Sequence, residues 1–227
     1  MTPDQLRSQL GGLVDRGYRG ATFADVARGE ITGRTLVVTF DDAFHSVLEH
    51  AAPAMSELGI PGTIFVPTRF PGTGGPLVWA GIDHWLGGEH DRELRSLDWD
   101  ELRSLAAAGW EIGSHTVSHP SLPELGDAAL ASELADSKAE IEAELGAACL
   151  TLAYPYGDHD SRVERAAESV GYIAAATTRP GPPARFRWGR VGVHPIDTPR
   201  RFAIKSSTLV NRIRSSRAGS YLERRAR

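Results

Sequence analysis

Two short segments of the sequence place carboxylates and imidazoles where buried strands are expected to end. Asp41 and Asp42 follow residues 35–40, an apolar run without alternation that is typical of a strand covered on both faces. His115 and His119 follow another short run, and their i, i+4 spacing puts both rings on one side of a coiled backbone. Because ligands gather at the carboxyl ends of parallel strands, we expect the carboxylates and imidazoles to share one face.

A catalytic metal centre is the chemistry that these residue types favour when taken together. Two adjacent, partly buried carboxylates are costly, and a divalent cation relieves the cost by binding one and leaving the other as a base. One Asp and two His would also leave open positions for water and substrate. Each motif alone has a simpler interpretation, as an Asp that caps the helix expected from residue 43 or as a pair of surface histidines.

Two later segments could complete such a site. Pro155 and Gly157 impose a turn that could direct the backbone N–H of Tyr156 into a cleft as an oxyanion donor, and a plain turn is the alternative. His194 follows a candidate strand at 190–193 and could be a general acid, although a lone histidine is more often structural or exposed.

The elements that must position these residues repeat one layout: a helix-compatible stretch, a glycine, then a short β-rich run. Glycine ends a helix cheaply in the left-handed conformation. The glycines concerned are Gly17, Gly59, Gly109 and Gly171. Helices are predicted at about 43–58, 98–108, 127–145 and 160–170, and a further strand at 149–153. The alternation predicts an α/β fold with a parallel sheet, open or closed.

Residues 67–88 interrupt this pattern with a long Gly- and Pro-rich segment. It contains Trp79 and Trp85, which favour a folded lid or binding loop. These tryptophans either form a sugar-stacking surface or pack the loop down. The single cysteine, Cys149, excludes an intramolecular disulfide and is expected to be inert core.

Composition excludes several classes of protein. The 227 residues are 41% hydrophobic and 24% charged, with net charge −4, which argues against a disordered chain and gives no reason to expect nucleic acid as a partner. No apolar run is long enough for a transmembrane helix, and the lack of a secretory signal predicts a cytoplasmic protein.

One catalytic domain is predicted over residues 1–205, followed by a basic tail at 206–227. After Pro180 there are 12 Lys and Arg against two acidic residues. Such a tail is either solvated or in contact with an acidic glycan, a partner or a membrane surface.

The order of the motifs resembles the polysaccharide deacetylases, carbohydrate esterase family 4, also described as the NodB homology domain. The similar segments are TFDD at 39–42, GSHTVSH at 113–119 and AYPYG at 153–157, within a resemblance that spans roughly residues 10 to 205. It implies a distorted TIM-like (β/α) barrel with about seven parallel strands. It also implies a divalent metal, usually zinc, with cobalt, nickel or manganese as alternatives, and a carbohydrate substrate.

The resemblance further implies roles for individual residues. Asp42, His115 and His119 would be the metal ligands, and Asp41 the general base that activates the attacking water. Pro155 and Tyr156 would lie beside the substrate, with the Tyr156 N–H on the oxyanion. His194 would correspond, loosely, to the acid of the last motif.

Several positions depart from the family pattern. Ala153 stands where the family often has Arg, Ala43 stands where Gly is usual, and Trp188 is the nearest match to the Trp of a fourth motif. Arg190 could take over an orienting or substrate-binding role. The predicted function is hydrolysis of acetyl groups from N-acetylated glycans; the alternatives are a non-catalytic glycan-binding domain, or hydrolysis of another amide or an O-acetyl ester.

Overall fold

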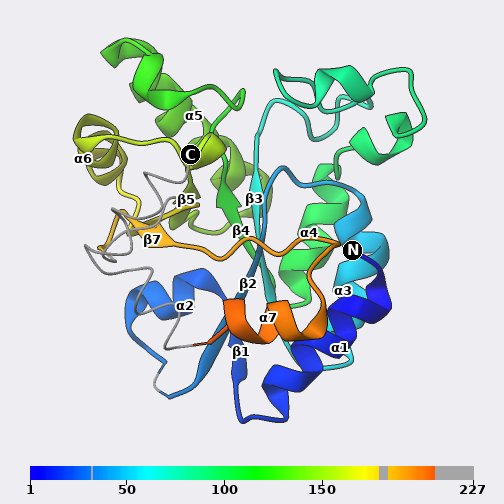
Figure 1. The fold of residues 1–227 in the computed structure, drawn as a ribbon. Helices are drawn as coiled ribbons and strands as arrows, with labels where there is room; N and C mark the ends of the chain where they lie inside the picture. Colours follow the sequence, from blue (N-terminus) through cyan, green and yellow to red (C-terminus); the bar gives the residue numbers. More distant parts are fainter. Residues whose placement is uncertain (32, 179–183, 208–227) are drawn as a thin grey trace, which may run out of the picture.

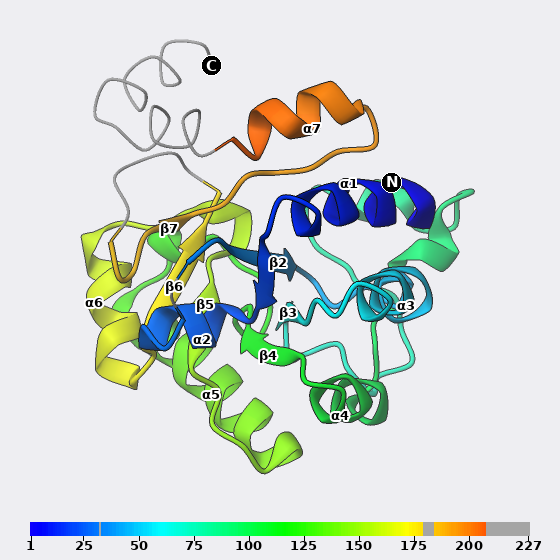
Figure 2. The same ribbon diagram turned by 90° about the horizontal axis from the view of Figure 1, so that it is seen from below.

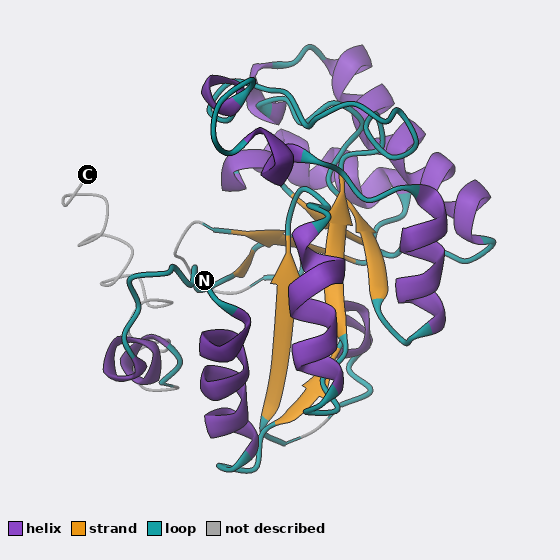
Figure 3. Ribbon diagram, turned by 90° about the vertical axis from the view of Figure 1, so that its right-hand side faces the viewer, coloured by secondary structure: helices purple, strands orange, loops and turns teal. Residues whose placement is uncertain are grey.

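The computed structural model describes residues 1–31, 33–178 and 184–207 of the chain, and its centre is one parallel sheet (Figure 1). The described strands pair in the order in which they occur along the chain, and every pair is parallel. Figure 3 shows that their carboxyl ends point to the loop-rich end of the molecule. The strands are β1 Arg19–Ala21, β2 Thr35–Phe40, β3 Gly62–Val66, β4 Glu111–Ser114, β5 Thr151–Ala153, β6 Ala174–Thr177 and β7 Trp188–Gly189.

The sheet curls into an incomplete barrel whose outer face is covered by helices (Figure 2). This arrangement confirms the expected distorted (β/α) barrel. The α-helices are α1 Pro3–Val14, α2 Phe23–Arg28, α3 Ala52–Ser56, α4 Trp99–Ala107, α5 Asp127–Leu145, α6 Ser161–Val170 and α7 Pro199–Lys205. Short turns of other types are π-helical η1 Val47–Ala51 and the 3-10 turns η2 Asp83–Trp85, η3 Asp91–Leu94, η4 Leu122–Glu124 and η5 Pro155–Gly157. No helix of the described residues is both long and apolar enough to cross a bilayer.

The helix–glycine–strand layout appears as the sequence predicts. All four of its glycines have positive φ, between 64° and 95°. The helix expected at 43–58 is split into η1 and α3, because Pro53 has no N–H to donate to residue 49 and the Ala52 N–H bonds to the carbonyl of Val47 instead. The other three predicted helices lie within one residue of α4, α5 and α6.

The strand predicted at 190–193 is wrong, and β7 is Trp188–Gly189. The Arg190 N–H still donates to the carbonyl of Thr177, the last residue of β6, at 2.9 Å. The described pairing of β6 with β7 ends at Thr177 and Gly189, and residues 191–193 belong to no described strand.

Residues 67–88 form a folded loop, as the tryptophans of this segment lead us to expect. Leu77 donates its N–H to the carbonyl of Leu94 at 2.8 Å, and both side chains are fully buried. The basic tail predicted for 206–227 lies outside the described residues from residue 208 onward.

Two apolar clusters hold the barrel, one outside the sheet and one inside it. The outer cluster joins the sheet to the surrounding helices. The inner cluster contains Phe65 of β3, Ala153 of β5 and Ala176 of β6, and Phe23 of α2 closes it with edge-to-face contacts to Phe65 and Trp188. The interior is filled largely by aromatic rings set against alanines and glycine.

Gly113→Ala should therefore destabilise the fold, by about 1–3 kcal/mol in urea unfolding. A Cβ at this position would lie 2.7 Å from the Phe65 ring and 2.9 Å from Thr151 Oγ1. Gly12→Ala in α1 is the matched control, because its Cβ meets nothing within 4 Å and alanine favours a helix by up to about 1 kcal/mol. A Gly113→Ala protein as stable as the wild type would contradict the tight interior.

Candidate metal centre and active site

Asp42, His115 and His119 meet at the carboxyl end of the barrel, as predicted. Asp42 follows β2, and the two histidines follow β4 on the loop 115–119. Asp42 Oδ1 lies 3.4 Å from Nε2 of His115 and 3.4 Å from Nε2 of His119. One ligand atom from each residue lies within 4.8 Å of the others, so the three side chains converge on one point.

The protein holds His115 in the tautomer that a metal ligand needs. Its side chain is 2% exposed, and Nδ1 donates a hydrogen bond to the carbonyl oxygen of Ala153 at 2.8 Å. Because Nδ1 is engaged by the Ala153 carbonyl, Nε2 is the nitrogen that faces Asp42 and is placed to bind a metal.

His119 is buried beside two aromatic rings. Trp79 stacks on it with ring centroids 4.2 Å apart, and the Tyr156 ring meets it edge-on at 4.6 Å. Burial, together with the neighbouring His115, lowers the pKa of His119 to about 3, so the imidazole is neutral. A neutral imidazole is the form that binds metals.

The donor set fits a divalent cation. Asp42 Oδ1 is buried and has no hydrogen-bond partner among the described residues, which is costly for a carboxylate oxygen. Burial, and the adjacent charge of Asp41, raise the pKa of Asp42 to about 6. A bound cation would satisfy this oxygen, and one carboxylate with two imidazoles is a familiar zinc donor set.

The Asp41 carboxylate is bound by Arg190. The guanidinium Nη1 and Nη2 donate to the two carboxylate oxygens at 2.6 and 2.8 Å, in a bidentate pair. Burial alone would raise the pKa of Asp41, but the charge and hydrogen bonds of Arg190, with the nearby histidines, lower it to about 2. Asp41 is therefore ionised and held in a defined orientation.

Arg190 reaches Asp41 from above the inner cluster. Its guanidinium carbon lies 5.5 Å from the centroid of the Phe65 ring, and Nη1 also donates to Thr39 Oγ1 at 3.0 Å. Small residues such as Ala153, packed against the same ring, leave space for this side chain. The contacts are those expected of an orienting residue, whereas contact of Arg190 with substrate stays a prediction.

Backbone strain gathers at this site. Among the described residues, the non-glycine positions with positive φ are Asp42, Ala43, Thr116, His119 and Tyr156. Each conformation costs about 1–3 kcal/mol and persists only where surrounding contacts enforce it. Every one of these positions is a predicted site residue or is adjacent to one.

Tyr156 lies in η5 with φ 58°, after the buried Pro155. Its hydroxyl donates to the carbonyl of Ala80 at 3.3 Å, which joins the turn to the loop that carries Trp79. Burial, with the charges of Asp42 and Asp83, raises the pKa of this phenol. The oxyanion role of the Tyr156 N–H stays a prediction.

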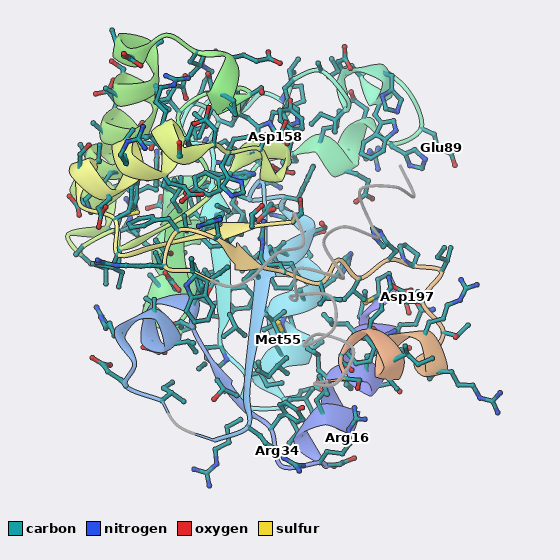
Figure 4. All side chains as sticks on the ribbon, turned by 60° about the vertical axis from the view of Figure 1, so that its left-hand side comes forward. Arg16, Arg34, Met55, Glu89, Asp158 and Asp197 are labelled. Atoms are coloured by element: carbon teal, nitrogen blue, oxygen red, sulfur yellow. The ribbon has the colours of Figure 1, made fainter. Side chains whose placement is uncertain are left out.

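Two predicted site residues are not brought to the cluster. Trp85 is 37% exposed and its ring contacts are with His84 and His90. The backbone N–H of His194 donates to Asp197 Oδ2 at 2.8 Å, and no described contact joins His194 to the metal ligands. Figure 4 shows Asp197 beside α7, well below the labelled Asp158 that follows η5.

Sequence reasoning missed Glu133, whose carboxylate binds the backbone between the two histidines. One sequence signal was available: Glu133 stands next to Leu134 and one helical turn before Ser137, and both of these residues are buried. An acidic residue so close to the buried face of a helix is expected to have a partner in the protein. Cys149 is buried, as expected, and burial raises the pKa of its thiol to about 12.

Arg190→Met should lower the free energy of unfolding by about 2–4 kcal/mol, because it leaves Asp41 charged and without its partner. Adding Asp41→Asn should recover part of the loss, and urea unfolding of the two single variants and the double variant measures this coupling. Arg7→Met is the control: the Arg7–Glu57 pair is 39% and 57% exposed, and its loss should change stability far less than the loss of Arg190. If the loss of unfolding free energy in the double variant equals the sum of the losses in the two single variants, the pairing of Arg190 with Asp41 is contradicted.

Comparison with known sequences identifies the family. The sequence profile of the family described as polysaccharide deacetylase matches residues 28–175. YxkH of Bacillus subtilis (strain 168), whose assignment as a polysaccharide deacetylase is provisional, is 28% identical over 163 residues, 72% of this chain and 51% of YxkH. A gellan lyase of Bacillus sp is 48% identical over 82 residues, 36% of this chain and 3% of the lyase. The chain thus spans about half of YxkH and a small part of the lyase.

Solved structures share the fold. The deacetylase PplD of Streptococcus pyogenes, in complex with acetate, has a TM-score of 0.75 at 20% identity, covering 90% of this chain and 87% of PplD. IcaB from Ammonifex degensii has a TM-score of 0.71 at 24% identity, covering 91% and 90%. The profile match over most of the barrel, together with this shared fold, shows that the chain belongs to the polysaccharide deacetylase family.

Proposed function

We propose that the protein is a metal-dependent hydrolase that removes acetyl groups from N-acetylated sugars of a glycan. The observation that carries the proposal is that two adjacent carboxylates have different partners. Asp42 faces two histidines and fits a metal ligand, whereas Asp41 is turned to Arg190 and kept ionised. A site built only to bind a glycan or a metal would have no use for the second carboxylate.

The proposed reaction divides its work among these residues. A bound divalent cation supplies Lewis acidity to the acetyl carbonyl and makes water more acidic. Asp41 accepts the proton of the attacking water, whose oxygen bonds to the acetyl carbon. The Tyr156 N–H is the proposed donor to the oxyanion that forms. The C–N bond then breaks, acetate leaves, and the sugar amine takes a proton.

The donor of that last proton is proposed to be His194 on the family resemblance alone. Its described neighbours are Asp197 and the loop that precedes α7. The substrate surface is proposed to include Trp79, because the indole stacks on His119 at the edge of the donor set. PplD, which shares the fold, was solved with acetate, the product that this reaction releases.

Substitutions at the two carboxylates should separate metal binding from catalysis. Asp42→Ala should lose both bound zinc and acetate release from an N-acetylglucosamine oligomer. Asp41→Asn should keep zinc and release acetate about 100-fold more slowly or worse, because it removes the base. Zinc content and released acetate are measured on the same preparations, with thermal melting to confirm folding. Wild-type acetate release by either variant would refute the assigned roles.

The two tryptophans offer a matched pair for the substrate surface. Trp79→Ala should raise KM for the same oligomer by about tenfold, as expected for a lost aromatic contact of about 1.4 kcal/mol. Trp85→Ala should leave KM within about twofold, since its ring contacts lie away from the donor set. Equal effects at both positions would mean that the loop as a whole, and not Trp79, contacts the glycan.

A further inference from the structure

The loop that carries both histidines has a strained backbone. Thr116 has φ 69° and His119 has φ 61°, in the left-handed region that side chains other than glycine rarely adopt. The Thr116 side chain supports the loop locally, because its Oγ1 accepts the His119 N–H at 3.1 Å. Other contacts must hold the residues between the two histidines.

The backbone N–H groups of residues 68 and 69 donate to the carbonyls of Thr116 and Val117. The remaining contacts come from one carboxylate on α5. Glu133 Oε2 accepts the backbone N–H of Val117 and of Ser118, each at 2.9 Å, and Oε1 accepts the Ser118 hydroxyl at 2.5 Å. Three charge-assisted hydrogen bonds to two consecutive residues form a clamp at the middle of the loop. Without the carboxylate, two partly buried N–H groups would lose their partners.

Glu133 is itself fixed against the barrel. Ser137 lies one turn later on the same face of α5. Its hydroxyl forms a hydrogen bond of 2.8 Å with the hydroxyl of Ser114 at the end of β4. Ser114 Oγ also accepts the Thr116 N–H at 3.1 Å. Leu130 and Leu134 are fully buried on this side of the helix, which lies beside β4 (Figure 2). The clamp therefore connects the loop to a rigid helix.

We propose that Glu133 is a positioning residue that sets the metal affinity of the site, by holding the His115–His119 loop in its strained, ligand-ready conformation. The inference rests on the proposed metal centre, but not on the substrate or the reaction. A rigid loop raises affinity because the two imidazoles need not be ordered when the metal binds.

Zinc affinity of the full chain, measured by competition with a chromophoric chelator, tests this role. Glu133→Ala should weaken zinc binding about 10-fold or more, the range of supporting groups around metal ligands. Glu133→Gln should weaken it by a smaller factor, because its amide can still form hydrogen bonds but without the charge. Glu140→Ala, an exposed acid on the same helix, is the control and should bind zinc as the wild type does.

Thermal melting without metal separates loss of fold from loss of affinity. A folded Glu133→Ala protein with wild-type zinc affinity overturns the proposal, as does an equal loss in Glu140→Ala. If Glu133→Ala does not fold, the Gln variant decides, and unchanged affinity there overturns the proposal. A wild type that binds no zinc overturns both this proposal and the metal centre. If zinc affinity falls in the expected order from the wild type to Glu133→Gln to Glu133→Ala, and the wild type releases no acetate, the role of Glu133 is supported. Only the proposed reaction is then refuted.

Discussion

Asp41 and Asp42 are adjacent at the end of β2. In largely buried surroundings, two negative charges so close together each need a compensating positive charge or must become protonated. The molecule treats them differently. Asp41 is neutralised by the guanidinium of Arg190, and Asp42 is turned to two imidazoles, where a cation fits. The small side chains of the inner cluster make room for the arginine. Much of the upper barrel is thus arranged around the separation of these two carboxylates.

That separation is maintained by conformations that the backbone would not adopt alone. The left-handed residues of the described chain occur at the ends of β2 and β4 and in the turn after β5, besides the glycines. Each depends on contacts from another element: Glu133 of α5 for the histidine loop, and the Ala80 carbonyl for the Tyr156 turn. Rigidity at the site therefore comes from helices and loops outside the barrel wall as well as from the strands.

Sequence patterns predicted the repeated helix–glycine–strand units because the conformational freedom of glycine and apolar periodicity are local properties. They also predicted that Asp42, His115 and His119 converge, since chemistry-bearing residues at strand ends meet in any parallel barrel. The partner of Asp41 could not be predicted in this way, because Arg190 lies far along the chain and its reach depends on how the interior is filled. The π-helical turn before Pro53 and the early end of β7 likewise depend on hydrogen bonds that no periodicity records.

The order of the strands has a consequence for biosynthesis. Arg190 is separated from Asp41 by 149 residues. At about 5–20 residues per second, the ribosome adds the arginine roughly 7 to 30 s after the aspartate. Strands β3 to β6 and helices α3 to α6 are synthesised in that interval, after β1 and β2. A nascent chain can therefore assemble most of the barrel wall while Asp41 still relies on water for its solvation, and the charge is neutralised internally only when the last strand docks.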